Sequence, residues 1–181
     1  ITGGDVIVTS EVDAEGNPLF SFKLQNNQYL PNSSEDNLLK LTSFEANGLK
    51  IVDITGNKIN KEDESVYPDL RNGFLHSATA TRFTDNVAVN VCNNSIEYTA
   101  VERAVEGAAL GGTVYFDGNT TIIHNENKAI VESVRRAVAR GGVMHGIGIH
   151  YTGNGNIDIL NNGVSASASA SINDLSGNPN T

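Results

Sequence analysis

The sequence predicts an α+β fold, an antiparallel β-rich sandwich or roll with two helices inserted in its second half. Residues 1–94 alternate short apolar segments with turn residues, which is typical of strands. Residues 95–148 contain two segments with apolar residues at helical spacing, each ending in Gly-Gly. We therefore expect one domain over residues 1–181, with strands and a tail over 149–181.

In the first half, alternation of apolar and polar residues predicts strands. The segments DVIVTSEVD and PLFSFKL each fit one strand. Asn47-Gly48 is a strong turn signal and predicts a hairpin between two apolar runs. The charged run 57–65 predicts a solvated loop. Residues 77–91 predict two strands, or one strand with a bend at Asp85-Asn86.

In the middle of the chain, two helices are expected over 95–112 and 125–142. In the first, Asn94 is a candidate N-cap and Gly111-Gly112 a candidate end. Residues 100–118 align with 130–148 at an offset of 30 residues, so each unit reads as helix, Gly-Gly, strand. Two copies are too few for a solenoid, and we expect both helices on one face of a sheet.

The segment EGAALGGTVYFDGNTTI, residues 106–122, resembles the opening of pectin-lyase-like right-handed β-helix proteins, where a short helix leads through Gly-Gly into the first strand. The resemblance covers fewer than 20 residues. Short, regular coils are not evident elsewhere in the sequence, and most of the expected strands precede this segment. It therefore leaves the expected architecture unchanged and implies no site residue.

The run GVSASASASIN, residues 163–173, alternates serine with small apolar residues. In a strand, one face is apolar and thin, and neither face carries a charge against edge pairing. One interpretation is a strand packed under the helices, and the other is a strand that joins a neighbouring subunit's sheet. The N-terminal strand is the rival donor. The predicted subunit-interface residues are Val164, Ala166, Ala168, Ala170, Ile172, Val6 and Val8.

The sequence shows no catalytic signature, so we expect no enzyme. His145 and His150 lie an odd number of residues apart, on opposite faces of a regular strand, and no zinc pattern is present. Cys92 is the single cysteine and reads as a buried small hydrophobe. We expect no cofactor, with one weak calcium alternative at the acidic turn, whose oxygen-bearing residues are Asp13, Glu15 and Asn17.

Composition sets the expected location and partners. A net charge of −9 disfavours nucleic acid, and no 18-residue apolar run spans a membrane. The start at Ile1 without a signal-like segment predicts a processed chain or an excised domain. The abundance of Asn, Gly, Ser and Thr favours an extracellular, cell-surface or virion protein. The candidate glycosylation sequons are at Asn32, Asn93 and Asn119.

These observations favour a structural subunit of an extracellular filament or pilus-like surface assembly, polymerising with itself through strand contacts between subunits. A virion structural protein, in a tail or as a capsid decoration, is the first alternative. A secreted glycan- or calcium-binding module is the second, with candidate aromatic residues Tyr29, Tyr67 and Tyr151.

Overall fold

The chain folds as a parallel β-solenoid. The computed structural model describes residues 3–29, 39–63, 70–100, 105–111, 113–133, 139–141, 144–145 and 149–168. Within these ranges every helix or strand element is a strand, and every strand pairing is parallel. The expected antiparallel α+β sandwich or roll is therefore wrong.

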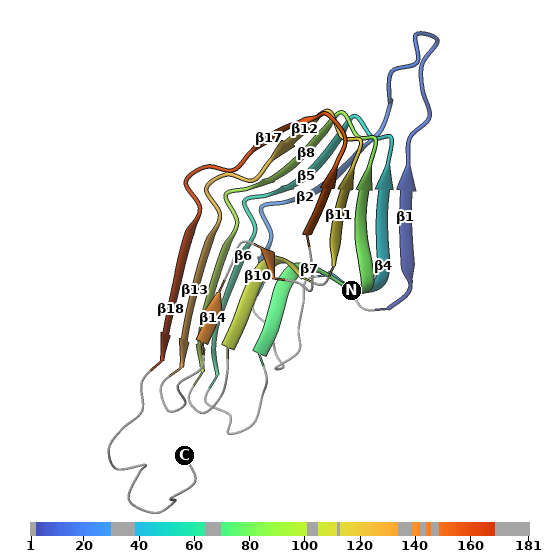
Figure 1. Cartoon of the computed structure of the whole chain (residues 1–181). Helices are drawn as coiled ribbons and strands as arrows, with labels where there is room; N and C mark the ends of the chain where they lie inside the picture. Colours follow the sequence, from blue (N-terminus) through green and yellow to red (C-terminus); the bar gives the residue numbers. More distant parts are fainter. Residues whose placement is uncertain are drawn as a thin grey trace, which may run out of the picture.

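The strands form three sheets (Figure 1). The first sheet has eight strands: β1 (Asp5–Thr9), β4 (Leu39–Asn47), β7 (Leu70–Thr84), β10 (Val105–Gly111), β11 (Val114–Asp117), β14 (Ala139–Gly141), β15 (Met144–His145) and β16 (Ile149–Thr152). The second has five: β2 (Ser21–Gln25), β5 (Ile51–Thr55), β8 (Ala88–Cys92), β12 (Thr121–Ile123) and β17 (Asn156–Asp158). The third has five: β3 (Gln28–Tyr29), β6 (Lys58–Asp63), β9 (Ser95–Ala100), β13 (Lys128–Ser133) and β18 (Gly163–Ala168).

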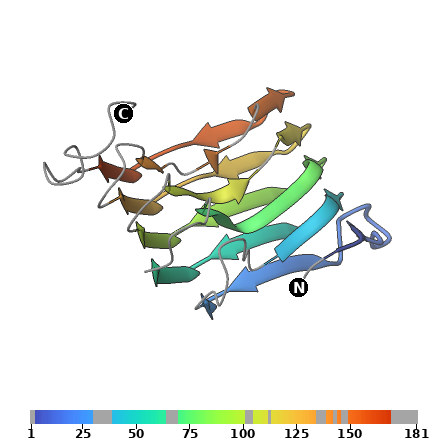
Figure 2. The same ribbon diagram turned by 90° about the horizontal axis from the view of Figure 1, so that it is seen from below.

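Each passage through the three sheets makes one coil, and the coils stack in chain order (Figure 2). The described part of the chain makes five coils, because the second and third sheets each contain one strand per coil. By residue range, coils 1 to 5 are 5–29, 39–63, 70–100, 105–133 and 139–168. Neighbouring coils are related by strand pairing, so each coil adds one strand spacing along the axis.

Each coil turns two sharp corners around the second sheet. One residue before each corner has a positive φ: Gly48, Asp85, Gly118 and Gly153 at the first corner, and Asn26, Gly56, Asn93, Glu126 and Asn161 at the second. From coil 2 onward, the two positive-φ residues of a coil are eight positions apart in the sequence. This left-handed conformation bends the chain in one step, which Gly and Asn permit at low steric cost.

The core lies inside the solenoid. One aromatic side chain from each coil stacks on that of the next coil, with ring centroids 5.2, 5.9, 5.1 and 5.0 Å apart in chain order. The members of this aromatic column are Phe22, Phe44, Phe83, Phe116 and Tyr151. Aliphatic rows of the second sheet, such as Val52–Val89–Ile122, complete the interior.

Both expected helices are wrong where the structure describes their residues. Strands β9 and β10 occupy the first segment, and β13 and β14 the second. Apolar residues in segments this short satisfy helical spacing and strand alternation at once. Pairing with the neighbouring coils decides the outcome, because Ser95 lies opposite both Lys58 and Lys128. Asn94 begins no helix and instead occupies the second corner of coil 3.

Three further expectations of the first half are resolved. Asn47-Gly48 forms a corner and no hairpin, since β4 and β5 belong to different sheets. The charged run 57–65 is no plain loop, because it contains strand β6 and its Ile59 is buried. The bend at Asp85-Asn86 is confirmed, between β7 and β8.

The internal repeat is real in kind, but its offset is wrong. Strands of coils 4 and 5 pair with 34 residues between Val105 and Ala139, and 35 residues between Val114 and Ile149. The aligned offset of 30 residues therefore does not describe the coil. Two units also proved to be part of a longer series, so the argument against a solenoid fails.

Candidate assembly surfaces at the two ends of the solenoid

An asparagine ladder runs along the second corner through all five coils. Its members directly follow the positive-φ residue of each coil, and they are Asn27, Asn57, Asn94, Asn127 and Asn162. The side chains of the middle members are almost completely buried. Buried amides cost free energy unless every polar atom is paired, and the ladder provides that pairing.

The hydrogen bonds of this ladder repeat with one pattern. The backbone N–H and the Nδ2 of Asn94 both donate to Asn127 Oδ1, at 3.2 and 2.9 Å. The second Nδ2 proton of Asn94 goes back one coil, to the carbonyl oxygen of Ile54 at 2.8 Å. Asn94 Oδ1 in turn accepts two bonds from Asn57, at 3.1 and 3.0 Å. Each middle asparagine thus links its coil to both neighbours.

A shorter ladder runs along the first corner. Asn119 Oδ1 accepts bonds from the backbone N–H and Nδ2 of Asn86, at 3.0 and 2.9 Å. Asn86 Oδ1 accepts from the backbone N–H of Leu49 at 2.9 Å. Both asparagines are buried, so this corner fixes coils 2 to 4 in the same way.

At the C-terminal end of the described solenoid, the last coil lacks a covering coil. Strands β17 and β18 are the outer strands of their sheets, and β16 pairs only with β11. Ile157 is 47% exposed, whereas Ile122, its partner in register, is 3% exposed. Ile159 and Leu160 are also exposed. This end therefore presents apolar side chains and unpaired strand edges together.

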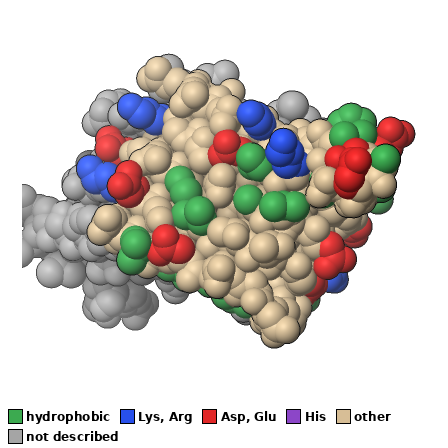
Figure 3. All heavy atoms as spheres, turned by 90° about the horizontal axis from the view of Figure 1, so that it is seen from above, with side chains coloured by type: hydrophobic (Ala, Val, Ile, Leu, Met, Phe, Trp, Pro, Cys, Tyr) green, Lys and Arg blue, Asp and Glu red, His purple; other side chains and the backbone are tan. Residues whose placement is uncertain are grey.

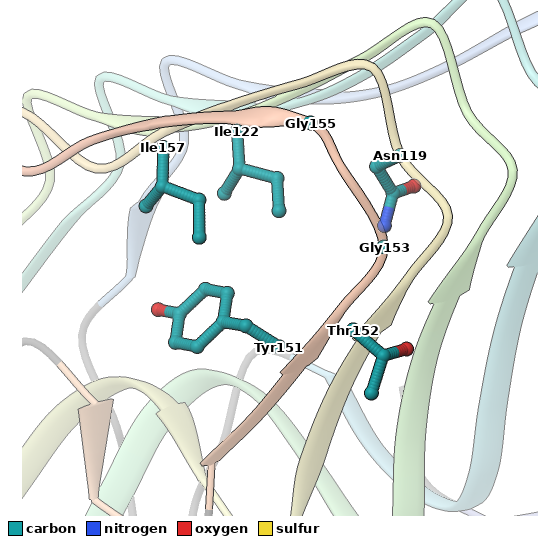
Figure 4. A pocket seen from close by; sticks show the side chains of 7 residues that line it. All are labelled: Asn119, Ile122, Tyr151, Thr152, Gly153, Gly155 and Ile157. Carbon is teal, nitrogen blue, oxygen red and sulfur yellow. The ribbon is translucent and has the colours of Figure 1, made fainter.

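A small hollow of about 110 Å³ lies between the last two coils at this end (Figure 4). The Tyr151 ring faces it from below and the side chains of Ile122 and Ile157 face it from above, with Asn119 at its edge. The Tyr151 hydroxyl oxygen is buried without a hydrogen-bond partner in the described part, and burial raises its pKa. The hollow's size suits a water molecule or two and no larger ligand.

At the N-terminal end, the first coil shows the same incomplete cover. Strands β1, β2 and β3 are the outer strands of their sheets. Val6, Val8, Phe22 and Leu24 pack on the core but are only partly buried. Their counterparts in coil 2, such as Phe44 and Ile54, are fully buried. The predicted interface residues Val6 and Val8 thus lie on the inner side of an outer strand.

The acidic turn lies in the loop between β1 and β2, which projects from the side of the solenoid (Figures 1 and 2). Asp13 Oδ1 accepts bonds from the backbone N–H groups of Glu15 and Asn17, at 3.0 and 2.7 Å, and these bonds lower its pKa. The carboxylate is therefore used to shape the turn. Figure 3 shows apolar and acidic side chains close together on this side of the molecule.

On the outer face of the first sheet, three side chains from successive coils stack in register. Arg82 lies over the Tyr115 ring, with its guanidinium carbon 4.2 Å from the centroid. The Tyr115 and His150 rings are parallel within 11°, with centroids 4.7 Å apart. His150 is exposed, so this row ends in an accessible ring at the last coil.

The histidines and the cysteine do not form a metal site among the residues that the structure describes. His124 is fully buried with its ring edge-to-face on Phe116, and neither ring nitrogen has a hydrogen-bond partner there. Burial lowers its pKa to about 4, so it is neutral at pH 7. Cys92 is partly buried on β8, and burial raises its thiol pKa.

The remaining predicted residues take these places. Val164, Ala166 and Ala168 pair with β13 in the outermost strand of the third sheet. Ala170, Ile172, Asn32 and Tyr67 lie outside the described residues. Asn93 is the exposed positive-φ residue of coil 3. Asn119 is buried, and its Nδ2 donates to the carbonyl oxygen of Phe83 at 2.8 Å. Tyr29 lies in β3.

The sequence contains a signal for both ladders that residue-type motifs do not capture. Asparagines recur eight positions apart in three coils: Asn86 with Asn94, Asn119 with Asn127, and Asn154 with Asn162. Each is preceded by Gly, Asn, Asp or Glu in the positive-φ position. The spacing measures the second sheet with its two corners, and it identifies a coil from sequence.

Comparisons of this chain with protein-family models, curated proteins and solved structures found no match. The described residues include no helix of the length and apolarity needed to cross a membrane. The geometry of the two ends therefore has to support the functional argument by itself.

Proposed function

We propose that this chain is a structural subunit of an extracellular or cell-surface filament, whose copies join end to end through strand contacts. The observation that carries the proposal is the incomplete cover of both ends. In the described part, three outer strands at each end have an unpaired edge, and the inner rows beside them are partly exposed. Unprotected edges of this kind pair readily with another chain.

The energetics favour covering these ends. Burial of an Ile side chain from half exposure contributes about 1 kcal/mol, and several apolar side chains at each end are in this state. Solenoid proteins that stay monomeric protect their ends with polar capping units. Here Ile157, Ile159 and Leu160 are exposed at the last described coil, without a charged side chain in their place.

The acidic, Asn- and Gly-rich composition supports an extracellular location. A virion structural protein would use the same end-to-end contact, and the location of the native protein separates the two. The Arg82–Tyr115–His150 row favours one further candidate, a glycan-binding module, because flat aromatic rings on an exposed sheet provide a surface for sugar rings. Loss of glycan binding in a Tyr115→Ala variant would support that candidate.

The first experiment compares Ile157→Lys with Val87→Lys. Ile157 is 47% exposed at the end of the solenoid, and Val87 is 44% exposed at a corner of coil 3. Light scattering and electron microscopy over a concentration series measure assembly, with circular dichroism as the folding control. We expect rods from the wild type and Val87→Lys, and monomers from Ile157→Lys, because a lysine at the end blocks stacking.

A wild-type chain that stays monomeric at the highest concentration would contradict the proposal. Equal assembly of the two lysine variants would place the contact away from the C-terminal end. In that case the side of the solenoid, including the loop between β1 and β2, becomes the surface to test next.

A further inference from the structure

The ladder at the second corner has a direction. In each coil, the backbone N–H and Nδ2 of the asparagine donate to Oδ1 of the next coil's asparagine. The other Nδ2 proton donates to a carbonyl oxygen of the previous coil. Every described coil follows this rule, so the two ends of the ladder are chemically different.

The last member keeps donors without acceptors in the described part of the chain. Asn162 Nδ2 donates to His124 O at 2.6 Å, while its second proton and the Asn162 backbone N–H have no described partner. The first member has the opposite need. Asn27 donates twice to Asn57 Oδ1, and its own Oδ1 accepts no hydrogen bond from a described residue.

We propose that copies of this chain stack head to tail in one register, with Asn162 of one copy donating to Asn27 Oδ1 of the next. This inference rests on the self-assembly proposed above and adds its direction and register. The arrangement is heterologous and open, so it generates a continuous, polar filament. It also continues the existing solenoid, with β17 beside β2 and β18 beside β3 of the next copy.

The same register completes the other bonds at that corner. By the repeating pattern, Asn27 Nδ2 of the next copy donates to Ile159 O, as Asn162 Nδ2 does to His124 O. The backbone N–H of Asn161 donates to Gln25 O of the next copy, as Glu126 N does to Leu160 O. Donors therefore meet acceptors along the whole corner.

The inner rows match as well. Register places Val8 of the next copy on Tyr151, since the row runs Val8–Ala46–Phe83–Phe116–Tyr151 within one copy. It likewise places Phe22 on Ile157, because that row runs Phe22–Val52–Val89–Ile122–Ile157. Partly exposed apolar side chains of one end thus cover those of the other end, as coils do within the chain.

Charge supports the same register on the outer face. The row of Lys23 and Asp53 continues through Asn90 and Ile123 to Asp158, so the stacked copies set Lys23 opposite Asp158. Opposite charges that face each other across strands are stabilising. The loop between β1 and β2 lies at the side of the solenoid and leaves the axial path open (Figure 2).

Symmetric stacking does not offer these matches. If two C-terminal ends met, the donors of Asn162 would face each other, and two N-terminal ends would bring together the Oδ1 acceptors of Asn27. Such contacts leave the ladder unsatisfied on both sides, which is costly once the contact is dry. An isologous dimer would also stop after two copies.

Cross-linking tests the direction and the register. In a Cys92→Ser background, Gln25→Cys and Leu160→Cys place thiols at exposed positions that the proposal makes neighbours across two copies. Adjacent strand positions lie within the distance a disulfide requires. We expect the double variant to form a ladder of linked oligomers under oxidation. Neither single variant should cross-link, and a mixture of both should give a linked dimer.

A wrong-register pair is the matched control. Ser21→Cys with Leu160→Cys keeps the same strands but separates the thiols by four residues, about 13 Å along the strand. Equal cross-linking of this pair would overturn the register. A linked dimer from Leu160→Cys alone would overturn the direction while leaving self-assembly intact. Absence of assembly by light scattering would instead mean that the proposed function itself fails.

A noncovalent measurement completes the test. Asn162→Ala removes the donating side chain, and we expect it to weaken association about tenfold or more, as loss of hydrogen bonds at a dry contact does. Asn154→Ala changes an exposed asparagine of the same coil and should leave association unchanged. Unchanged association in both variants would overturn the role of the ladder.

Discussion

The middle coils and the end coils share one architecture but differ in how completely their side chains are covered. Phe44, Phe83 and Phe116 are fully buried, whereas Phe22 and Tyr151, the ends of the same aromatic column, are only partly buried. The ladder shows the same contrast in hydrogen bonds. Each coil therefore completes its neighbours, and stability in this fold belongs to pairs of coils more than to single ones.

The largest expected effect breaks the aromatic column in a middle coil. Phe116→Ala removes a buried ring that contacts Phe83, Tyr151 and His124, and we expect it to lower the free energy of unfolding by about 4 kcal/mol. Tyr151→Ala at the end should cost about 1–2 kcal/mol, because that ring is only partly buried. Urea unfolding of the monomer measures both, and equal losses would erase the contrast.

The ladder provides the next comparison. Asn94→Ala leaves the two donors of Asn57 and the carbonyl oxygen of Ile54 without partners, and should destabilise the fold by about 3 kcal/mol. In the monomer, Asn162→Ala should cost about 1 kcal/mol, since half of its ladder bonds are absent already. A chemical denaturation series below the assembly concentration checks both. A cost at Asn162 as large as at Asn94 would contradict it.

Acid provides a third comparison through His124. Its folded pKa of about 4 lies below its value of 6.5 in the unfolded chain, so the unfolded chain binds the proton first. Stability is therefore retained above pH 6.5 and lost as the pH falls toward 4. We expect the wild type to lose about 2.5 kcal/mol relative to His124→Leu between pH 7.5 and 4.5. A difference that does not vary with pH would show that the site admits water.

The smallest expected effect concerns a corner residue. Glu126 has a φ of 58° at the position where coil 2 has Gly56. A side chain in this left-handed region costs about 1 kcal/mol, so Glu126→Gly should stabilise the fold by about 0.5–1 kcal/mol. Glu126→Ala keeps the strain and serves as the control. Thermal melts compare the two, and a gain shared by Ala would point to charge removal instead.

Sequence reasoning predicted the strands of the first half because their alternation is local. The pairs Ser21–Phe22 and Lys23–Leu24 alternate between exposed and partly buried, as expected. It failed on parallel pairing because the partner of each strand lies one coil away, about 30 to 37 residues along the chain. Asn94 illustrates the second failure, because an asparagine before an apolar segment is equally suited to cap a helix and to hold a corner.

For the candidate site, the sequence indicated an unprotected terminal strand but not the ladder that orients it. Asparagine abundance was visible, yet only the eight-residue spacing shows which asparagines are buried. The inner rows at each end could not be predicted, since partial exposure there results from the absence of a covering coil. A property of the stack is not encoded in any one strand.

The constant spacing between the two corners also separates a coil's length in residues from its length in space. Other parts of the coil vary, since successive ladder asparagines are 30, 37, 33 and 35 residues apart. Each coil nevertheless advances the axis by one strand spacing, so five coils occupy about 24 Å. A head-to-tail fibre would therefore show an axial repeat near 24 Å whatever its coil circumference, while its mass per unit length would rise with every residue added outside the corners.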